Sequence, residues 1–207
     1  KFYHFNRQGE YLRATDQPTV SDYGFRDVAI ANDLIYGGDG AEWIIGVDAN
    51  GEVQDSLPGL FEIQRALSYD QAHDEYYIAS STSPIIRIDS DGNIIQQYDN
   101  ENELEIHGLA FMADDPDGYS LYIASQNRLD PDLETAQALI SKLDPATGDI
   151  RTVVVLEGQV EDRIGGIEIA PDFDTRKWVM LAVMNNPEGD RVSVYDLGPS
   201  TNWASYD

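Results

Sequence analysis

Polar residues that could contact a ligand lie at the ends of short apolar segments, and this arrangement is repeated along the chain. Four segments that read as strands cover residues 25–31, 63–69, 106–112 and 164–170, and each is followed by a second strand. Convergent polar groups in an apolar frame are typical of a binding site. The candidate ligand contacts are Arg26, Asp27, Gln64, Arg65 and His107 at the starts of first strands, and Asp39, Ser81, Gln126, Asn127, Asn185 and Asn186 at the ends of second strands.

His107 is the candidate whose side chain could transfer a proton near neutral pH. On its strand it could act as a base, hold a metal ion, or hydrogen-bond a neighbouring carbonyl. The sequence contains neither a nucleophile-elbow serine motif nor a second histidine at zinc-binding spacing. We therefore predict a binding site without catalytic residues and without a metal.

Acidic runs such as DSDGN at 89–93 raise the question of calcium. Calcium takes six to eight oxygen ligands, and the calcium loop of an EF-hand needs acidic residues at fixed alternate positions before its glycine. This run fails that spacing, so we interpret it as a hairpin turn. No cofactor is expected, beyond adventitious calcium.

Hairpins return along the chain with the same turn chemistry. An apolar strand ends in Asp or Asn, a short turn with glycine follows, and a second strand begins. The side-chain oxygen can cap the turn, and the glycine can take the positive φ that closes it. The turn pairs are Asn6 with Gly9, Asp48 with Gly51, Asp89 with Gly92, Asp144 with Gly148, and Asp196 with Gly198.

A unit of four antiparallel strands results when each hairpin is joined to the strand pair that precedes it. Its length of about 40–50 residues is typical of a β-propeller blade. Each first strand is short and rich in small apolar residues, as the innermost strand of a blade must be. We predict a single all-β domain over 1–207, with blades at about 21–59, 60–101, 104–158 and 162–207.

Residues 1–16 supply only the outer two strands of a preceding blade, which makes about four and a half blades in total. We expect the chain to be part of a larger propeller, with the remaining blades of the parent protein as partners, because an open blade leaves an unpaired sheet edge. An immunoglobulin-like sandwich pair is the alternative architecture, but it does not explain the four-strand period. An extra loop or short helix over 128–137 falls on the face that carries the candidate contacts, where insertions into repeats often mark binding.

The units IHGLAFMADDPDGYSLYIASQN (106–127) and YDQAHDEYYIASSTSPIIRIDSDGNII (69–95) resemble blades of the propeller superfamily that includes NHL-repeat, YVTN-type and gluconolactonase-like proteins. The resemblance implies the fold, whereas the superfamily contains scaffolds, ligand binders and hydrolases. Residues 164–197 also resemble the last blade in secreted multidomain bacterial proteins, which implies export. A gluconolactonase-like hydrolase would hold a divalent metal with Glu, Asn and Asp on the axis; Asp27, Asn127 and Asn185 could contribute, but the first strands offer no glutamate at their starts.

The formal net charge of −25 comes from 38 acidic and 13 basic residues. Such a surface repels nucleic acid and anionic membranes, so we expect neither nucleic-acid binding nor membrane insertion. It suits a solvated protein in a salty medium, and we expect a secreted or cell-surface location. The chain has no cysteine, which excludes disulfides and thiolate chemistry.

Three functions remain open from the sequence. The first is a non-catalytic extracellular propeller that binds a protein or glycan partner at the mouth of its axial channel. The second is a metal-dependent hydrolase of the gluconolactonase-like kind, and the third is a passive structural module. We favour the first, because the signatures of catalysis are incomplete.

Overall fold

The computed structural model describes residues 1–19, 24–38, 43–127, 136–156, 163–174, 177–185 and 189–199. All regular structure in these ranges is β-strand. No helix there is long and apolar enough to cross a membrane.

Seventeen strands form five antiparallel sheets in the described ranges, and within each sheet neighbouring strands are consecutive in the chain. Three sheets have four strands, one has three, and one has two. The two-stranded sheet is β1 (Phe2–Phe5) and β2 (Tyr11–Thr15), and the first four-stranded sheet is β3 (Val28–Ala31), β4 (Leu34–Gly38), β5 (Trp43–Val47) and β6 (Val53–Pro58). The second is β7 (Ala66–Asp70), β8 (Glu75–Ala79), β9 (Ile85–Asp89) and β10 (Ile94–Tyr98). The third is β11 (Ile106–Phe111), β12 (Leu121–Asn127), β13 (Gln137–Leu143) and β14 (Ile150–Val155), and the three-stranded sheet is β15 (Arg163–Asp174), β16 (Lys177–Asn185) and β17 (Arg191–Pro199).

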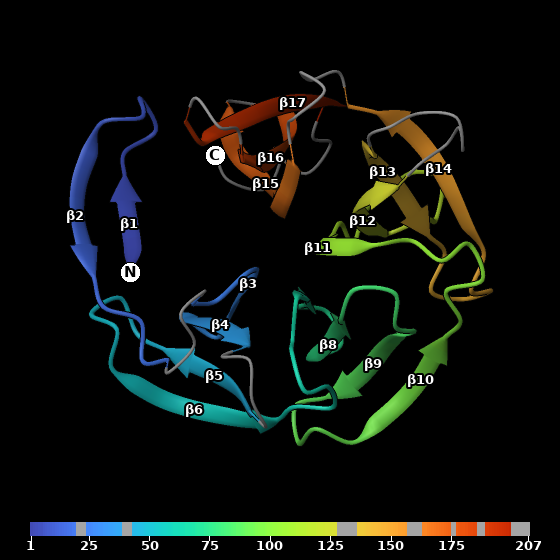
Figure 1. Cartoon of the computed structure of the whole chain (residues 1–207), viewed down its shortest axis with the longest axis horizontal. Coiled ribbons are helices and arrows are strands. Elements are labelled where there is room, and N and C mark those ends of the chain that lie inside the picture. Colours follow the sequence, from blue (N-terminus) through green and yellow to red (C-terminus); the bar gives the residue numbers. More distant parts are fainter. Residues whose placement is uncertain are drawn as a thin grey trace.

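The sheets stand around a common centre like the blades of a propeller (Figure 1). Strands β3, β11 and β15 lie near the centre, whereas β6, β10 and β14 lie at the rim. Inner strands of successive sheets contact one another, β3 with β7, β7 with β11 and β11 with β15. The predicted propeller is therefore confirmed, and the sandwich alternative is wrong because the strands pair within successive units and the sheets of the described residues are arranged around one centre.

The half blade takes its place in the same ring. Sheet β1–β2 lies between β15–β17 and β3–β6, at the outer edge (Figure 1). It is the outer pair that the sequence predicted for residues 1–16. The last sheet has three strands in the described ranges, and the fourth strand expected for it lies outside them.

The hairpin turns form as the sequence predicts. The side-chain oxygen of Asp48 accepts the N–H groups of Asn50 and Glu52 at 2.8 and 3.0 Å, and Asp89 does the same for Asp91 and Asn93 at 3.0 and 2.8 Å. All five turn glycines have positive φ, from 78° to 108°. Asp and Gly at these positions therefore determine where one strand ends and the next begins, and DSDGN is a turn.

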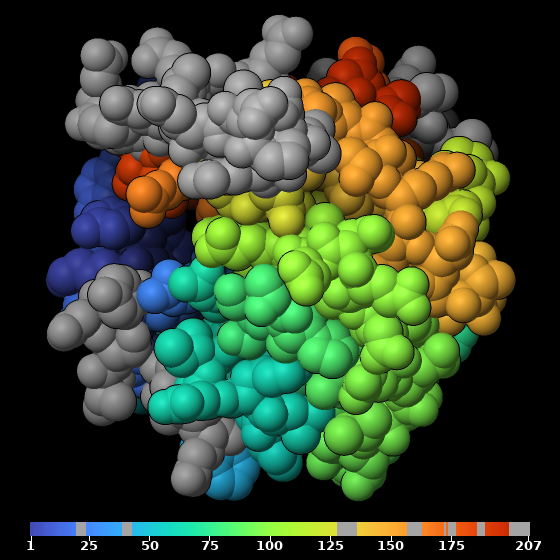
Figure 2. All heavy atoms as spheres, turned by 45° about the vertical axis from the view of Figure 1, so that its right-hand side comes forward, coloured from blue at the N-terminus to red at the C-terminus, as the bar shows by residue number. Residues whose placement is uncertain are grey.

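The apolar core lies between sheets, in three separate clusters. One packs β3–β5 against β7–β9, the next packs β7–β9 against β11–β13, and the last packs β11–β13 against β15 and β16. The space-filling view shows consecutive sheets in direct contact, from the cyan atoms through green to orange (Figure 2). This packing holds the inner strands at the distances that form the site.

Candidate functional site

A cavity of about 670 Å³ lies where the inner strands converge. Its wall is formed by residues at or just before the starts of β3, β7, β11 and β15, together with residues of β16. This is the axial position where the sequence places a ligand. Five of the predicted contacts line it: Arg26, Asp27, Arg65, His107 and Asn185.

Asp27 ties three inner strands together beneath the cavity. Its Oδ2 atom accepts the backbone N–H of Leu67 in β7 at 3.1 Å and that of Leu109 in β11 at 2.9 Å. A Cβ on Gly166 in β15 would come within 2.4 Å of its Oδ1 atom, so this close approach requires glycine. Burial raises the pKa of the Asp27 carboxyl well above its usual range, although the two backbone hydrogen bonds oppose the shift.

Glu105 is shared by two neighbouring strands at the cavity. Its Oε1 atom lies 3.7 Å from Nη1 of Arg65, before β7, and 3.6 Å from Nε2 of His107, in β11. Both distances exceed a good hydrogen bond, and both nitrogens are buried atoms without a hydrogen-bond partner in the described part of the chain. Burial lowers the pKa of His107, and the charge of Arg65 lowers it further.

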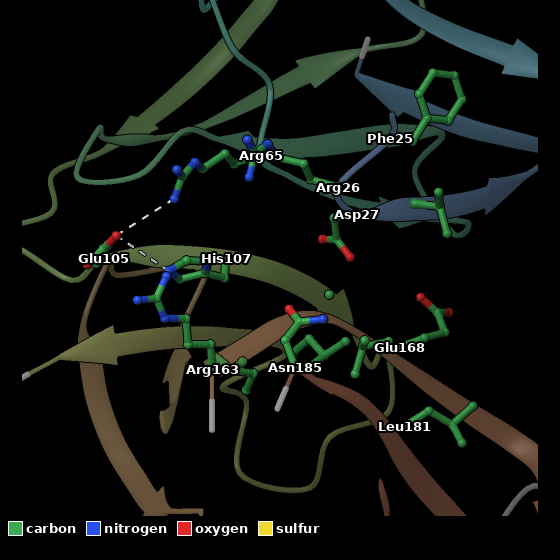
Figure 3. A pocket seen from close by; sticks show the side chains of 16 residues that line it. Phe25, Arg26, Asp27, Arg65, Glu105, His107, Arg163, Glu168, Leu181 and Asn185 are labelled. Atoms are coloured by element: carbon green, nitrogen blue, oxygen red, sulfur yellow. Dashed lines mark ion pairs between the residues drawn. The ribbon is translucent and has the colours of Figure 1, made fainter. Parts of the chain in front are cut away.

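Arg163 extends the positive charge to the fourth inner strand. Its guanidinium, carried by β15, lies beside His107, while Arg26 lies near Arg65 on the opposite side of the opening (Figure 3). Asn185 at the end of β16 points into the cavity (Figure 3), and its amide donates to Asp190 at 3.2 Å. We call Arg26, Arg65, His107 and Arg163 the basic rim.

The other wall of the cavity is mostly apolar. Val28, Leu181 and Val183 line it with partly or fully exposed side chains, and Glu168 stands next to them. Solvent reaches the Glu168 side chain. Neighbouring protein groups nevertheless displace part of the hydration of its carboxyl, which raises the pKa of Glu168 to about 7.

Four predicted contacts lie elsewhere, in structural hydrogen bonds. Gln64 is buried, and its amide donates to the carbonyl of Phe61. The Ser81 carbonyl accepts the N–H of Ile106 at 3.0 Å, which joins the end of one sheet to the start of the next.

Gln126 and Asn127 also bind backbone. Gln126 accepts the N–H of Ile164 at 3.0 Å, and Asn127 accepts the N–H of Glu105 at 3.0 Å while donating to the carbonyl of Glu103 at 3.1 Å. These two side chains hold β11 and β15 in register with β12. Asp39, Asn186 and residues 128–135 of the insertion predicted over 128–137 lie outside the described residues.

Sequence reasoning missed three charged residues that line the cavity: Glu105, Arg163 and Glu168. Glu105 and Arg163 lie two residues before His107 and Gly165, and alternate residues of a strand share a face. Extending each inner strand by two residues toward the opening would have found both. The sequence analysis considered glutamates only at the starts of the inner strands, whereas Glu105 stands one residue before β11 and Glu168 lies within β15.

The residues expected to hold an axial metal do not fit one. The Oδ2 atom of Asp27 already accepts two backbone N–H groups. The Asn127 amide accepts one backbone N–H and donates to one backbone carbonyl. Asp27 and Asn185 of that set line the cavity, whereas Asn127 is not among the lining residues.

One group elsewhere has metal-ligating residue types, namely Asp70, His73 and Glu75. It stands at the other end of β7, Nδ1 of His73 lies 2.7 Å from Asp70, and Glu75 is paired with Arg87. The three carboxylate and imidazole groups are therefore already occupied by protein partners.

Comparison with known proteins gives the fold. No known protein family and no curated protein matches the sequence. Among solved structures the chain is similar to the computationally designed Ika4 protein, at 14% identity over 90% of this chain and 99% of that one, with a TM-score of 0.45. It is also similar to streptogramin B lyase, at 12% identity over 87% of this chain and 57% of the lyase, with a TM-score of 0.51. This chain thus spans little more than half of the lyase, and the likeness shows a shared β-propeller fold.

Proposed function

We propose that this propeller is a non-catalytic binding protein that engages a protein or glycan partner at the mouth of its axial channel. The observation that carries the proposal is the cavity of about 670 Å³, which lies on the axis and is lined by polar residues from four inner strands. That volume is in the range of ligand pockets. Its wall is held by buried hydrogen bonds such as those of Asp27, so the site is formed before a partner arrives.

The mixture of donors and acceptors in the cavity supports recognition. Arginine and histidine donors face one side, while Asn185, Glu105 and Glu168 offer acceptors. A partner that inserts one polar group into this cavity would replace the hydrogen bonds of that group to water with hydrogen bonds to fixed side chains. Groups whose donors and acceptors do not match these side chains would bind less well, which gives specificity.

Glycan and peptide arrays would test the proposal with the labelled chain. We expect binding to a restricted set of probes, and loss of that binding in the triple variant Arg26→Ala, Arg65→Ala, Asn185→Ala. The matched control is Arg13→Ala, because Arg13 is an exposed arginine that does not line the cavity and donates to the carbonyl of Ala49. Equal binding by the wild type and the triple variant would contradict the proposal.

A hydrolase is the second candidate, and Glu168 is the observation that favours it. A carboxyl with a pKa of about 7 on a cavity wall could accept or donate a proton at neutral pH. A screen with lactones and phosphoesters, with and without divalent metals, separates the two candidates. Turnover that disappears in Glu168→Gln would favour the hydrolase over the binding protein.

Extracellular location stays a prediction from the acidic composition. Fractionation of cells that produce the full-length parent protein would test it, and recovery in the cytoplasmic fraction would contradict it.

A further inference from the structure

We propose that the basic rim receives one carboxylate attached to an apolar group, as found at the C-terminus of a protein chain that ends in an apolar residue. This inference rests on the proposed binding role and names the chemistry of the group bound.

Positive charge is concentrated at the cavity in a chain that has little of it. The protein carries 13 basic residues against 38 acidic ones. Three of the arginines, from three different sheets, nevertheless meet at one opening of about 670 Å³. Like charges brought together repel, so a cluster of this kind is typical of a site for an anion.

Two nitrogens at the rim lie near a single acceptor without forming a hydrogen bond to it. Arg65 Nη1 and His107 Nε2 are buried without a hydrogen bond, and both point at the same Glu105 oxygen from more than 3.5 Å. Arg65 Nη1 always carries protons, and His107 Nε2 carries one in one of its two neutral tautomers, so a buried donor stands here without an acceptor, which is unfavourable. A second carboxylate at the rim would supply the missing acceptors, and the planar arginine fork suits its two oxygens.

The rest of the cavity limits the ligand to a single negative charge. Glu105 and Glu168 already bring carboxylates to the wall, and the whole chain carries a net charge of −25. Polyanions such as phosphorylated chains or acidic polysaccharides are therefore repelled at long range and again within the cavity. One carboxylate at the rim avoids most of that repulsion.

The apolar wall determines what the carboxylate is attached to. Val28, Leu181 and Val183 present partly exposed aliphatic side chains in the same cavity, with Val28 two residues after Arg26 and Val183 against Gly165. An apolar side chain bound there would bury this surface from water, at about 25 cal/mol per Å². A polar sugar ring would leave that wall poorly matched, so a peptide C-terminus fits better than a glycan.

Calorimetric titration of the chain with acetyl-Ala-Ala-Leu, its C-terminal amide and 4-methylpentanoate tests the proposal. We expect the free-acid peptide to bind, the amide to bind about 10- to 100-fold more weakly, and Arg65→Gln and Arg163→Gln to lose a similar factor. Arg65→Lys should recover part of the loss, and Arg13→Ala should bind as the wild type does. Circular dichroism of each variant checks that it is folded.

Four results would overturn the inference. Equal binding of acid and amide would show that the carboxylate is not recognised, and unchanged binding in both glutamine variants would place it away from the rim. Equal affinity for 4-methylpentanoate and the peptide would make a free small acid the ligand instead of a chain end. If neither acid binds while the arrays still show rim-dependent binding of a glycan, this inference fails and the binding role stands.

Discussion

Replacing Asp27 tests whether its carboxylate holds the inner strands together. Asp27→Ala leaves the N–H groups of Leu67 and Leu109 buried without an acceptor. Each orphaned amide costs about 1–3 kcal/mol, so we expect the free energy of unfolding to fall by about 2–6 kcal/mol. That is a large part of the 5–15 kcal/mol typical of a domain, and Asp27→Asn should lose much less, because one carbonyl oxygen can accept both amides.

The raised pKa of Asp27 also predicts how the free energy of unfolding changes with pH. Burial raises the pKa of Asp27 in the folded chain above its value of about 3.9 in the unfolded chain. The stabilising contribution is therefore complete below pH 4 and is lost as pH rises through the folded-state pKa. Asn cannot ionise, so wild-type stability should fall relative to Asp27→Asn with increasing pH, by at most about 1.4 kcal/mol per pH unit.

Urea unfolding followed by tryptophan fluorescence, from pH 4.5 to 9, measures both effects. Asp89→Ala is the matched control, because Asp89 also accepts two backbone N–H groups but in an exposed turn, where water replaces it. We expect that control to cost less than Asp27→Ala. Equal losses in the alanine and asparagine variants at position 27, or an Asp27→Asn difference that does not change with pH, would refute the reasoning.

Three further variants test the turns, the buried ion pair and the cavity. Gly51→Ala should destabilise the chain more than Gly9→Ala in thermal unfolding, since both have positive φ but only at Gly51 would a Cβ meet a backbone oxygen, at 2.5 Å; equal losses would contradict this. Lys142→Met should cost about 3–5 kcal/mol because it leaves the buried Asp115, 2.7 Å away, without its cationic partner, although the Tyr122 hydroxyl still donates to it, and adding Asp115→Asn should recover most of that in urea unfolding. Between pH 8 and 6.5, protonation of Glu168 should tighten the binding of acetyl-Ala-Ala-Leu in calorimetry, whereas Glu168→Gln should bind with constant affinity over that interval.

The fold was largely predictable because its signals are local. Each hairpin is specified by an Asp or Asn and a glycine a few residues apart, and these determine strand ends without reference to distant residues. The ring follows from four repetitions of that unit. The structure adds the pairing of the sheets and the place of the half blade, which depend on contacts between distant residues.

The site was predictable only in part, since its residues are positioned by tertiary contacts. Arg65 and His107 were found because they begin inner strands. Gln126 and Asn127 have the same polar character, but backbone groups of the next inner strand bind them. Glu168 was missed because its environment, and not its spacing, makes it unusual.

The three apolar clusters have a consequence for how the molecule opens. Each cluster contains residues of only two successive sheets. The stability of every sheet therefore depends on packing against its immediate neighbours. Sheets β7–β10 and β11–β14 are supported from both sides, whereas β3–β6 and β15–β17 share a cluster with one neighbour each. Amide hydrogens should therefore exchange last in the two middle sheets, and loosening should begin at the ends of the row and travel inward.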